Sequence, residues 1–470
     1  MAKKGKIRKG FTTYLLVLFI ALVAAFMIFV TIMLFSPFKN VLGLKYFLYQ
    51  SEDYVYNVTN ADNGEIFDFS KIQQINIDCN YADVRVERYD NIDNNAIIIT
   101  NNTKGFAKEG QNTDFTYTVT YANPENTILN VKVTEPVGFL YLSKDITITV
   151  AVPIHSSYAL ADTKVDITNT SGDIYIGNNI RITTVGSNEI DLNSFSVKTN
   201  SGRVFLFSHI NGNFNDIFIK STKGNIQINK NLEVANSFEL HSTSGDIKMQ
   251  DLTLSNQKVV FDINNSKLTA NAINAGVDLS INKGILEVSN INGNLVANDS
   301  NKQMKSASIT IGRVSGAISL PFANASKIEI EEITDKGACY IHATSGSVTL
   351  GKTYAYADIE TTTGAITMHT YADDFKVKTT KGKIDVKFDC STIKNQIDIT
   401  STKGEVNLAV KDNLKFVLAI YNAEGKDRTD NINIEFLKQK FTNPLTINGG
   451  TNIAKIITDG KVNVSIIEAN

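Results

Sequence analysis

The sequence predicts an all-β protein: a β-solenoid (β-helix-like) of repeated 18–22-residue coils, preceded by one N-terminal transmembrane α-helix. Three observations predict it. A short phrase with a central glycine recurs along most of the chain, apolar residues alternate around each copy, and a long uncharged segment lies near the N-terminus. Side chains of a strand alternate between two faces, so this alternation is typical of strands with one buried face.

The repeated phrase has one rule in ten copies. Thr or Asn stands two positions before the glycine, and apolar residues stand two and four positions after it. This order indicates a strand, a tight turn and a second strand. Glycine permits a positive φ at the corner, and the neighbouring Thr or Asn can hydrogen-bond the local backbone. The predicted turn residues are Gly172, Gly202, Gly224, Gly245, Gly284, Gly346, Gly364, Gly382, Gly404 and Gly460.

The spacing of these glycines favours a solenoid. Five pairs of neighbouring copies lie 18–22 residues apart, which suits coils that stack their apolar positions on one another. Wider gaps follow Gly245 and Gly284, and we expect degenerate copies there, around Asn265–Ser266–Lys267 and Val314–Ser315–Gly316. A propeller that uses two copies per blade, a sandwich and a barrel are the structural alternatives.

The uncharged segment, residues 11–35, predicts a membrane anchor. Its 25 residues would span about 37 Å as a helix, enough for the roughly 30 Å hydrocarbon core. The alternative, a cleaved signal peptide, would have a shorter apolar core. Five basic residues precede the segment, so the positive-inside rule predicts a single-pass cell-membrane protein with a cytoplasmic N-terminus and an extracytoplasmic bulk. These residues are Lys3, Lys4, Lys6, Arg8 and Lys9.

The chain divides into six expected parts. The segments between the anchor and the repeats are β-like but less regular, with a hairpin expected around Asn123–Pro124–Glu125–Asn126. The parts are a basic cytoplasmic tail (1–10), the transmembrane helix (11–36), a juxtamembrane segment or stalk (37–66), an N-terminal β region or cap (67–160), the repetitive β-solenoid (161–410) and a C-terminal β region with a final coil (411–470).

Composition excludes several classes of function. A formal net charge of −2 gives no reason to expect nucleic-acid binding. The three cysteines are far apart and form no CxxC or Cys/His cluster, so we expect no metal and no cofactor, while a Cys339–Cys390 disulfide stays open.

Candidates for chemistry are few, and we expect no catalytic residue. The acidic pairs Asp373–Asp374 and Glu331–Glu332 are typical of solvated turns, because neighbouring side chains point in different directions. His241 and His342 share a repeat position, which is no metal signature. Four lysines at the equivalent corner position form a possible basic ladder for an anionic glycan or lipid headgroup, or a solvated corner: Lys223, Lys283, Lys381 and Lys403.

The phrase Thr-Ser-Gly-Asp-Ile, at residues 170–174 and 243–247, resembles a bacterial domain family of unknown function usually labelled "putative adhesin". Its members carry such phrases in tandem, often behind a single transmembrane segment. The resemblance covers residues 67–467. It implies surface attachment and carries over no catalytic residue.

Three functions from different classes follow. The first, which we favour, is a membrane-anchored, non-catalytic surface interaction module, adhesin-like, whose partner is a surface glycan or an envelope protein. The second is a structural or sensory envelope component that assembles with a membrane partner. The third is a glycan-active β-helix enzyme, which would need charged residues gathered at one point of the solenoid.

Overall fold

The computed structural model describes residues 4–35, 40–41, 44–50, 54–58, 71–89, 96–108, 114–136, 140–153, 160–177, 192–207, 213–297, 304–324, 327–334, 337–437 and 440–467. The chain forms two compact units. The first comprises Met1–Tyr54, Thr100–Thr116 and Thr134–Ile146, and the second comprises Val55–Ile99, Tyr117–Val133 and Thr147–Asn470.

The first unit contains one helix and a small antiparallel sheet. The helix is α1 (Lys4–Phe35). The sheet has the order β1 (Asn40–Val41), β2 (Leu44–Gln50), β7 (Lys104–Lys108) and β10 (Leu140–Ser143). Strands β1, β2 and β3 (Tyr54–Val58) therefore occupy part of the 37–66 segment that the sequence presented as a stalk or a first strand.

Helix α1 does not support the predicted membrane anchor. Within the described residues, no helix combines the length and apolar character needed to cross a membrane. The prediction of a transmembrane helix over 11–36, and with it a single-pass protein with a cytoplasmic N-terminus and extracytoplasmic bulk, is wrong.

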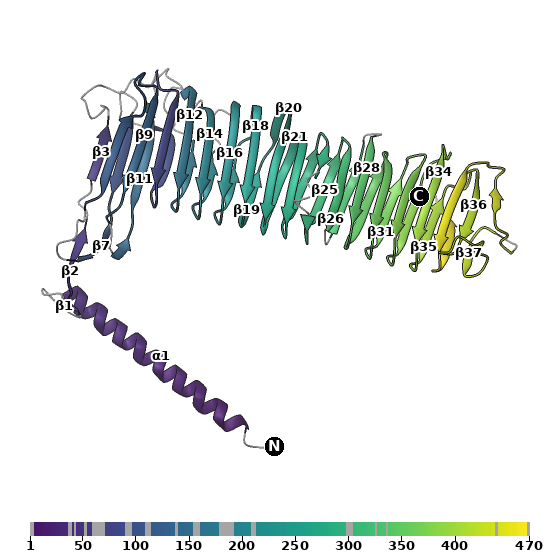
Figure 1. Cartoon of the computed structure of the whole chain (residues 1–470), viewed down its shortest axis with the longest axis horizontal. Coiled ribbons are helices and arrows are strands. Elements are labelled where there is room, and N and C mark those ends of the chain that lie inside the picture. The colour runs from purple at the N-terminus through teal and green to yellow at the C-terminus, as the bar shows by residue number, and fades with distance from the viewer. Residues whose placement is uncertain are drawn as a thin grey trace. The chain divides into compact units, whose positions relative to one another are not determined.

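The second unit is a solenoid-like stack of parallel strands, which confirms the predicted all-β class (Figure 1). Each coil contributes one strand to each of two rows of pairings, here called the first and the second sheet, and one long strand joins them into a single 36-stranded sheet. In the first sheet the spatial order is β9 (Ile128–Thr134), β4 (Gln74–Cys79), β12 (Leu160–Asn169), β14 (Leu192–Thr199), β16 (Asn213–Ser221), β18 (Leu232–Ser242), β20 (Leu252–Asn264), the second half of β21 (Ser266–Asn282), β23 (Leu295–Val296) with β24 (Met304–Lys305), β26 (Ile318–Asn324), β28 (Ala338–Ala343), β30 (Tyr356–Thr361), β32 (Phe375–Thr379), β34 (Gln396–Ser401), β39 (Ile453–Thr458), β36 (Phe416–Tyr421) and β38 (Leu445–Ile447).

The second sheet has the matching order. It runs β3 (Tyr54–Val58), β6 (Ala96–Asn101), β11 (Ile146–Pro153), β5 (Asp83–Tyr89), β13 (Ile174–Ile176), β15 (Val204–Leu206), β17 (Ile226–Ile228), β19 (Gly245–Met249), the first half of β21, β22 (Ile285–Ile291), β25 (Ser308–Val314), β27 (Lys327–Ile333), β29 (Ser347–Thr353), β31 (Ile366–Thr370), β33 (Ile384–Phe388), β35 (Val406–Val410), β40 (Val462–Ile466) and β37 (Ile432–Ile434). Strand β8 (Thr116–Tyr121) joins β9 through the expected hairpin, where Ala122 N donates to Ile128 O.

The repeated apolar positions form the core. Ile174 pairs with Val204 and Val204 with Ile226 in parallel register, and all three side chains are buried. In the other sheet Phe195, Ile217 and Phe238 stack in the same way. Each coil therefore covers the apolar face of the next, as the alternating pattern predicted.

One of the two expected degenerate copies lies at the corner and the other does not. Ser266 pairs with Gly245 and takes its place in the next coil. Gly316 instead stacks on Gly293 at a different bend. Because Leu286 pairs with Ile309, the corner after Gly284 falls at Ser306–Ala307, where no glycine marks it.

The corner glycines are required by the close approach of successive coils. A Cβ on Gly202, Gly224, Gly364, Gly382 or Gly404 would overlap the carbonyl oxygen of the corner glycine one coil earlier. A positive φ occurs at Gly172, Gly245 and Gly346 among the ten predicted turn glycines. The expected need for a positive φ therefore applies to three of the ten glycines. The close contact between successive coils explains the others.

A row of buried hydroxyls completes the corner. Thr379 Oγ1 accepts a hydrogen bond from Gly382 N at 3.0 Å and donates to Gly364 O of the preceding coil at 3.2 Å. Ser401 makes the same two bonds with Gly404 N and Gly382 O. Each hydroxyl thus satisfies one donor and one acceptor of the buried backbone, which would be costly to leave unpaired.

At the N-terminal end the chain does not stack its coils in sequence order. Strand β4 lies between β9 and β12, and β5 lies between β11 and β13, so strands from later in the chain lie directly outside the first regular coil. The first regular coil is therefore covered on both sides.

The C-terminal end repeats this arrangement. Strand β39 lies between β34 and β36, and β40 lies between β35 and β37, so residues 416–434 form an outer layer. Arg428, 5 % exposed, donates from Nη1 to Thr458 O and Gly460 O, both at 2.6 Å. Its guanidinium thereby hydrogen-bonds two backbone carbonyls at the C-terminal end of the row of glycine corners.

Gly382→Ala should lower the free energy of unfolding by about 1–3 kcal/mol, because its methyl group would overlap Gly364 O. The matched control is Gly276→Ala, whose Cβ would meet Lys258 Cγ at 3.5 Å and Asn294 O at 3.8 Å. Urea unfolding of both variants checks this. Equal stability of the two variants would contradict the close-approach explanation.

Arg428→Met should loosen the C-terminal layer, because two buried carbonyls lose their donor at a cost of about 1–3 kcal/mol each. Hydrogen exchange of the amides in β37, β39 and β40 should accelerate. The control is Lys426→Ala, since Lys426 is 75 % exposed in its ion pair with Glu424. Unchanged exchange in Arg428→Met would show that the guanidinium does not hold this end.

Candidate binding surfaces

The bend between the strands of one coil changes length along β16, β18, β20 and β21. Phe214 and Asp216 pair with Val234 and Ser237, so β18 has one more residue here than β16. Strand β20 gains another relative to β18, and β21 is again shorter. The chain therefore bulges outward over neighbouring coils and then withdraws, which hollows the surface.

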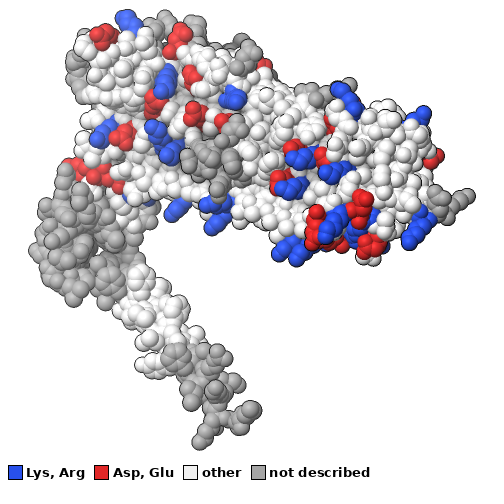
Figure 2. Space-filling view, turned by 45° about the vertical axis from the view of Figure 1, so that its right-hand side comes forward, with Lys and Arg blue, Asp and Glu red and all other residues white. Residues whose placement is uncertain are grey.

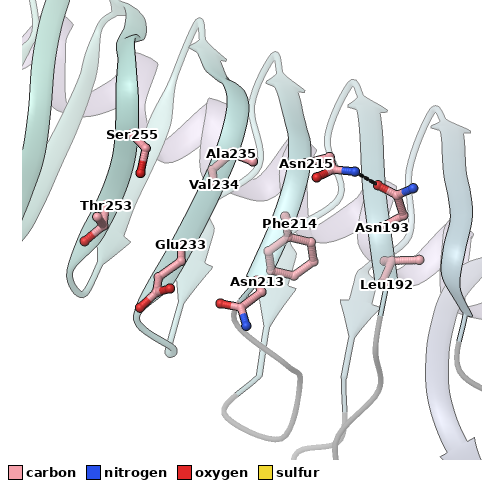
Figure 3. Close-up of a pocket in the computed structure, with 10 residues that line it drawn as sticks. All are labelled: Leu192, Asn193, Asn213, Phe214, Asn215, Glu233, Val234, Ala235, Thr253 and Ser255. Atoms are coloured by element: carbon pink, nitrogen blue, oxygen red, sulfur yellow. Dashed lines mark hydrogen bonds between the residues drawn. The ribbon is translucent and has the colours of Figure 1, made fainter.

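The resulting groove has a volume of ≈ 390 Å³ (Figure 3). Two rows of outward side chains cross it from strand to strand, while the residues between them, such as Phe214 and Val234, are buried. One row is Asn213, Glu233 and Thr253, and the other is Asn193, Asn215, Ala235 and Ser255.

The polar groups of this groove are mostly amides and hydroxyls. Asn215 Nδ2 donates to Asn193 Oδ1 at 2.6 Å, and Asn274 Nδ2 donates to Thr253 Oγ1 at 3.0 Å. Glu233 is exposed, is the one charged residue in the lining, and forms no ion pair or hydrogen bond with the described residues. The groove thus offers exposed donors and acceptors with little net charge.

A second groove, of ≈ 720 Å³, lies outside β21, β22, β25, β27 and β29. Its charges oppose one another: Arg313 pairs in register with Glu332, and Glu332 with Lys352. At its rim Lys267 forms an ion pair with Glu287 at 2.7 Å. The sequence treated Glu331–Glu332 as a solvated turn, whereas here both residues line a groove of mixed charge.

Three aromatic rings gather outside β13 and β15. Tyr175, Phe205 and Phe207 lie nearly parallel, with centroids 5.3–5.9 Å apart. Arg85 lies over the Tyr175 ring at 4.7 Å and Arg203 over Phe205 at 5.2 Å. The rings stack on one another and the guanidinium groups lie over two of them, so this cluster is a stabilising contact between coils.

Asp173 adds a charge to that cluster. Burial alone would raise its pKa, but hydrogen bonds and the charge of Arg203 outweigh burial and hold the pKa below its usual value. The contact therefore contributes stability above the ordinary Asp pKa of about 4 and loses it as pH falls through the lower folded-state pKa. The Asp of the Thr-Ser-Gly-Asp-Ile phrase has a structural partner here.

The four predicted ladder lysines lie at corners of separate or paired coils. Lys223 stands between Ser201 and Ser244 of the neighbouring coils. Lys283 stands between Asn265 and Ser306, and all three have a positive φ. Lys381 and Lys403 occupy consecutive coils, followed by Asp459.

Charges of both signs alternate over the face in Figure 2, where blue and red atoms intermix. Several pairs link neighbouring strands, for example Lys378–Glu360 at 2.6 Å and Lys411–Asp389 at 3.0 Å. His241 and His342 each contact a different carboxylate, Asp262 and Asp358. Among the described residues no group of three His, Cys, Asp or Glu is placed to hold a metal ion.

Sequence reasoning missed the first groove, although the sequence holds a signal for it. The interval between two buried residues grows from three positions (Phe214 to Ile217) to four (Val234 to Phe238) and then five (Leu254 to Val259). A repeat whose interval grows coil by coil predicts a widening bulge on the surface.

The parallel coils, the layered ends and the open lateral grooves define a solenoid-like β-repeat protein. The sequence profile of the Toastrack family DUF4097 matches residues 72–337 and 267–465, more than half of the chain. The chain belongs to this family. The resemblance to an adhesin-like family of unknown function is thereby confirmed.

Solved structures offer distant similarities. A putative cell adhesion protein from Clostridium sporogenes is 6 % identical, covering 88 % of this chain and 100 % of its own, with a TM-score of 0.15. A putative adhesin from Parabacteroides merdae is 11 % identical, covering 73 % and 97 %, with a TM-score of 0.17. A putative lipid binding protein from Parabacteroides distasonis is 10 % identical, covering 88 % and 97 %, with a TM-score of 0.14. No curated protein matches the chain.

The cysteines should differ in reactivity. Cys339 and Cys390 are free thiols, so the disulfide left open by the sequence is not formed. Burial raises the pKa of Cys339 to about 12, whereas Cys390 is partly exposed. A maleimide at pH 8 should modify Cys390 and leave Cys339 intact until the chain unfolds, as measured by peptide mass spectrometry. Cys390→Ser is the control, and rapid modification of Cys339 in the folded protein would contradict its burial.

Proposed function

We propose that this protein is a non-catalytic, adhesin-like binding module that attaches to ligands displayed on cell or matrix surfaces. The observation that carries the proposal is the groove across β16, β18 and β20, whose outward side chains leave polar groups available to a ligand. Membership of the Toastrack family and the adhesin-like descriptions of its neighbours support the same function.

The repeat architecture suits attachment. Successive coils carry outward side chains in rows, so a long ligand can touch several coils at once. Contacts that are weak one by one then add in a single bound state, because each later contact forms at a high effective concentration.

A glycan-active enzyme has less support. Hydrolysis of a glycosidic bond uses two carboxyl groups that face one substrate bond. Asp374 Oδ2 instead accepts a hydrogen bond from Asn395 Nδ2 at 2.5 Å, and Glu332 pairs in register with Arg313 and Lys352. Asp374 thus contacts an amide, and Glu332 lies in register between two basic residues.

Purified full chain, labelled at Cys390, should bind at least one kind of cell or matrix saturably, as measured by flow cytometry and on coated plates. Unlabelled chain should compete with it, since a finite set of ligands is occupied. The chain unfolded by heat is the control and should lose this binding. Labelled chain that adheres to no cell or matrix beyond the level of the unfolded control would refute the proposal.

A further inference from the structure

We propose that the groove lined by Asn193, Asn215, Glu233, Ala235 and Thr253 is a binding site for a neutral carbohydrate chain. This inference rests on the proposed function, because it names the ligand class of the same surface. It is drawn from the polar groups, the shape and the charge of the groove.

The polar groups match hydroxyls. An amide both donates and accepts hydrogen bonds, as does a hydroxyl, and five of the groove's side chains are of these two kinds. Sugar hydroxyls also donate and accept, so they can form hydrogen bonds with these amides and hydroxyls. No charged group on the ligand is needed. Glu233, which has no partner among the described residues, can accept from two neighbouring hydroxyls in bonds that its charge strengthens.

The shape matches an extended chain. Asn213, Glu233 and Thr253 follow one another across paired strands, so the row advances by about 4.8 Å per coil. A polymer of hydroxyl-rich units can place successive units against successive coils. In the second row Ala235 lies between Asn215 and Ser255 (Figure 3). Its exposed side chain is a single methyl group, which leaves room for a sugar ring.

The charge separates a neutral ligand from other classes. The one charged side chain of the lining is acidic, so an acidic polysaccharide or a phosphate would meet repulsion and no basic partner in the lining. The second groove is different, because basic and acidic residues of its lining stand in register on neighbouring strands. An uncharged, hydroxyl-rich chain fits the first groove best.

The test measures binding of the full chain to immobilised neutral polysaccharides (dextran, mannan and galactan) and acidic ones (alginate and hyaluronan) by biolayer interferometry. At least one neutral polymer should bind and the acidic ones should not. Ala235→Trp fills the hollow from an exposed position and should weaken binding at least about tenfold. Glu233→Ala removes a charged acceptor and should do the same. The matched control is Ala365→Trp, which adds the same bulk at an exposed alanine on another coil and should leave binding unchanged.

Each contrary result has a definite meaning. Binding to acidic polymers alone, or neutral binding that Ala235→Trp leaves intact, would overturn the proposed site. Cell attachment without any binding to neutral polysaccharides would overturn this inference while leaving the adhesive function in place. If cell attachment itself is absent, the proposed function fails with it. Circular dichroism and urea unfolding of each variant confirm that the solenoid remains folded.

Discussion

The close approach of successive coils at the glycine corner is the constraint on which the rest of the structure depends. Parallel strands lie about 4.8 Å apart, and at the glycine corners the backbone of one coil leaves no room for a Cβ in the next, whereas Ser266 and Ala307 take the corner position in two other coils. The buried hydroxyls of Thr379 and Ser401 can bridge consecutive coils only because the glycines let the carbonyls come within reach. Once the corners are in register, every core and surface row that follows them is in register too.

The same constraint explains where the surface can vary. Additional residues between corners cannot enter the ladder without shifting it, so they are placed at bends that face solvent. The coils of β16, β18 and β20 lengthen at one such bend while Ile217, Phe238 and Val259 stay paired. The groove therefore arises where coils of unequal length share one regular ladder of paired strands. Its lining residues can change without loss of the core.

The regular part of this fold is predictable from the sequence, and the irregular parts are not. Alternating apolar residues and the 18–22-residue period identify the coils because each coil repeats the same burial. The corner at Ser306–Ala307 could not be predicted, because without a glycine no local feature of the sequence distinguishes it from a strand. The layered ends could not be predicted either, because β9 and β11 pair with β4 and β5, which lie dozens of residues earlier in the chain. The local sequence pattern carries no information on such distant pairing. The anchor prediction rested on the uncharged residues 11–35, whereas the described part of α1 does not meet the requirement for a span.

The two layered ends determine which strands lie at the limits of the solenoid. A solenoid that stopped at a regular coil would present a full row of unpaired backbone groups, an edge that invites pairing with other chains. Here β9, β11, β6 and β3 lie outside the first regular coil at one end. At the other end β36, β37 and β38 lie outside β39 and β40, and Arg428 donates to carbonyls of the corner row. The proposed attachment instead uses side chains on the lateral faces, such as the rows of Asn, Thr and Glu across β16, β18 and β20.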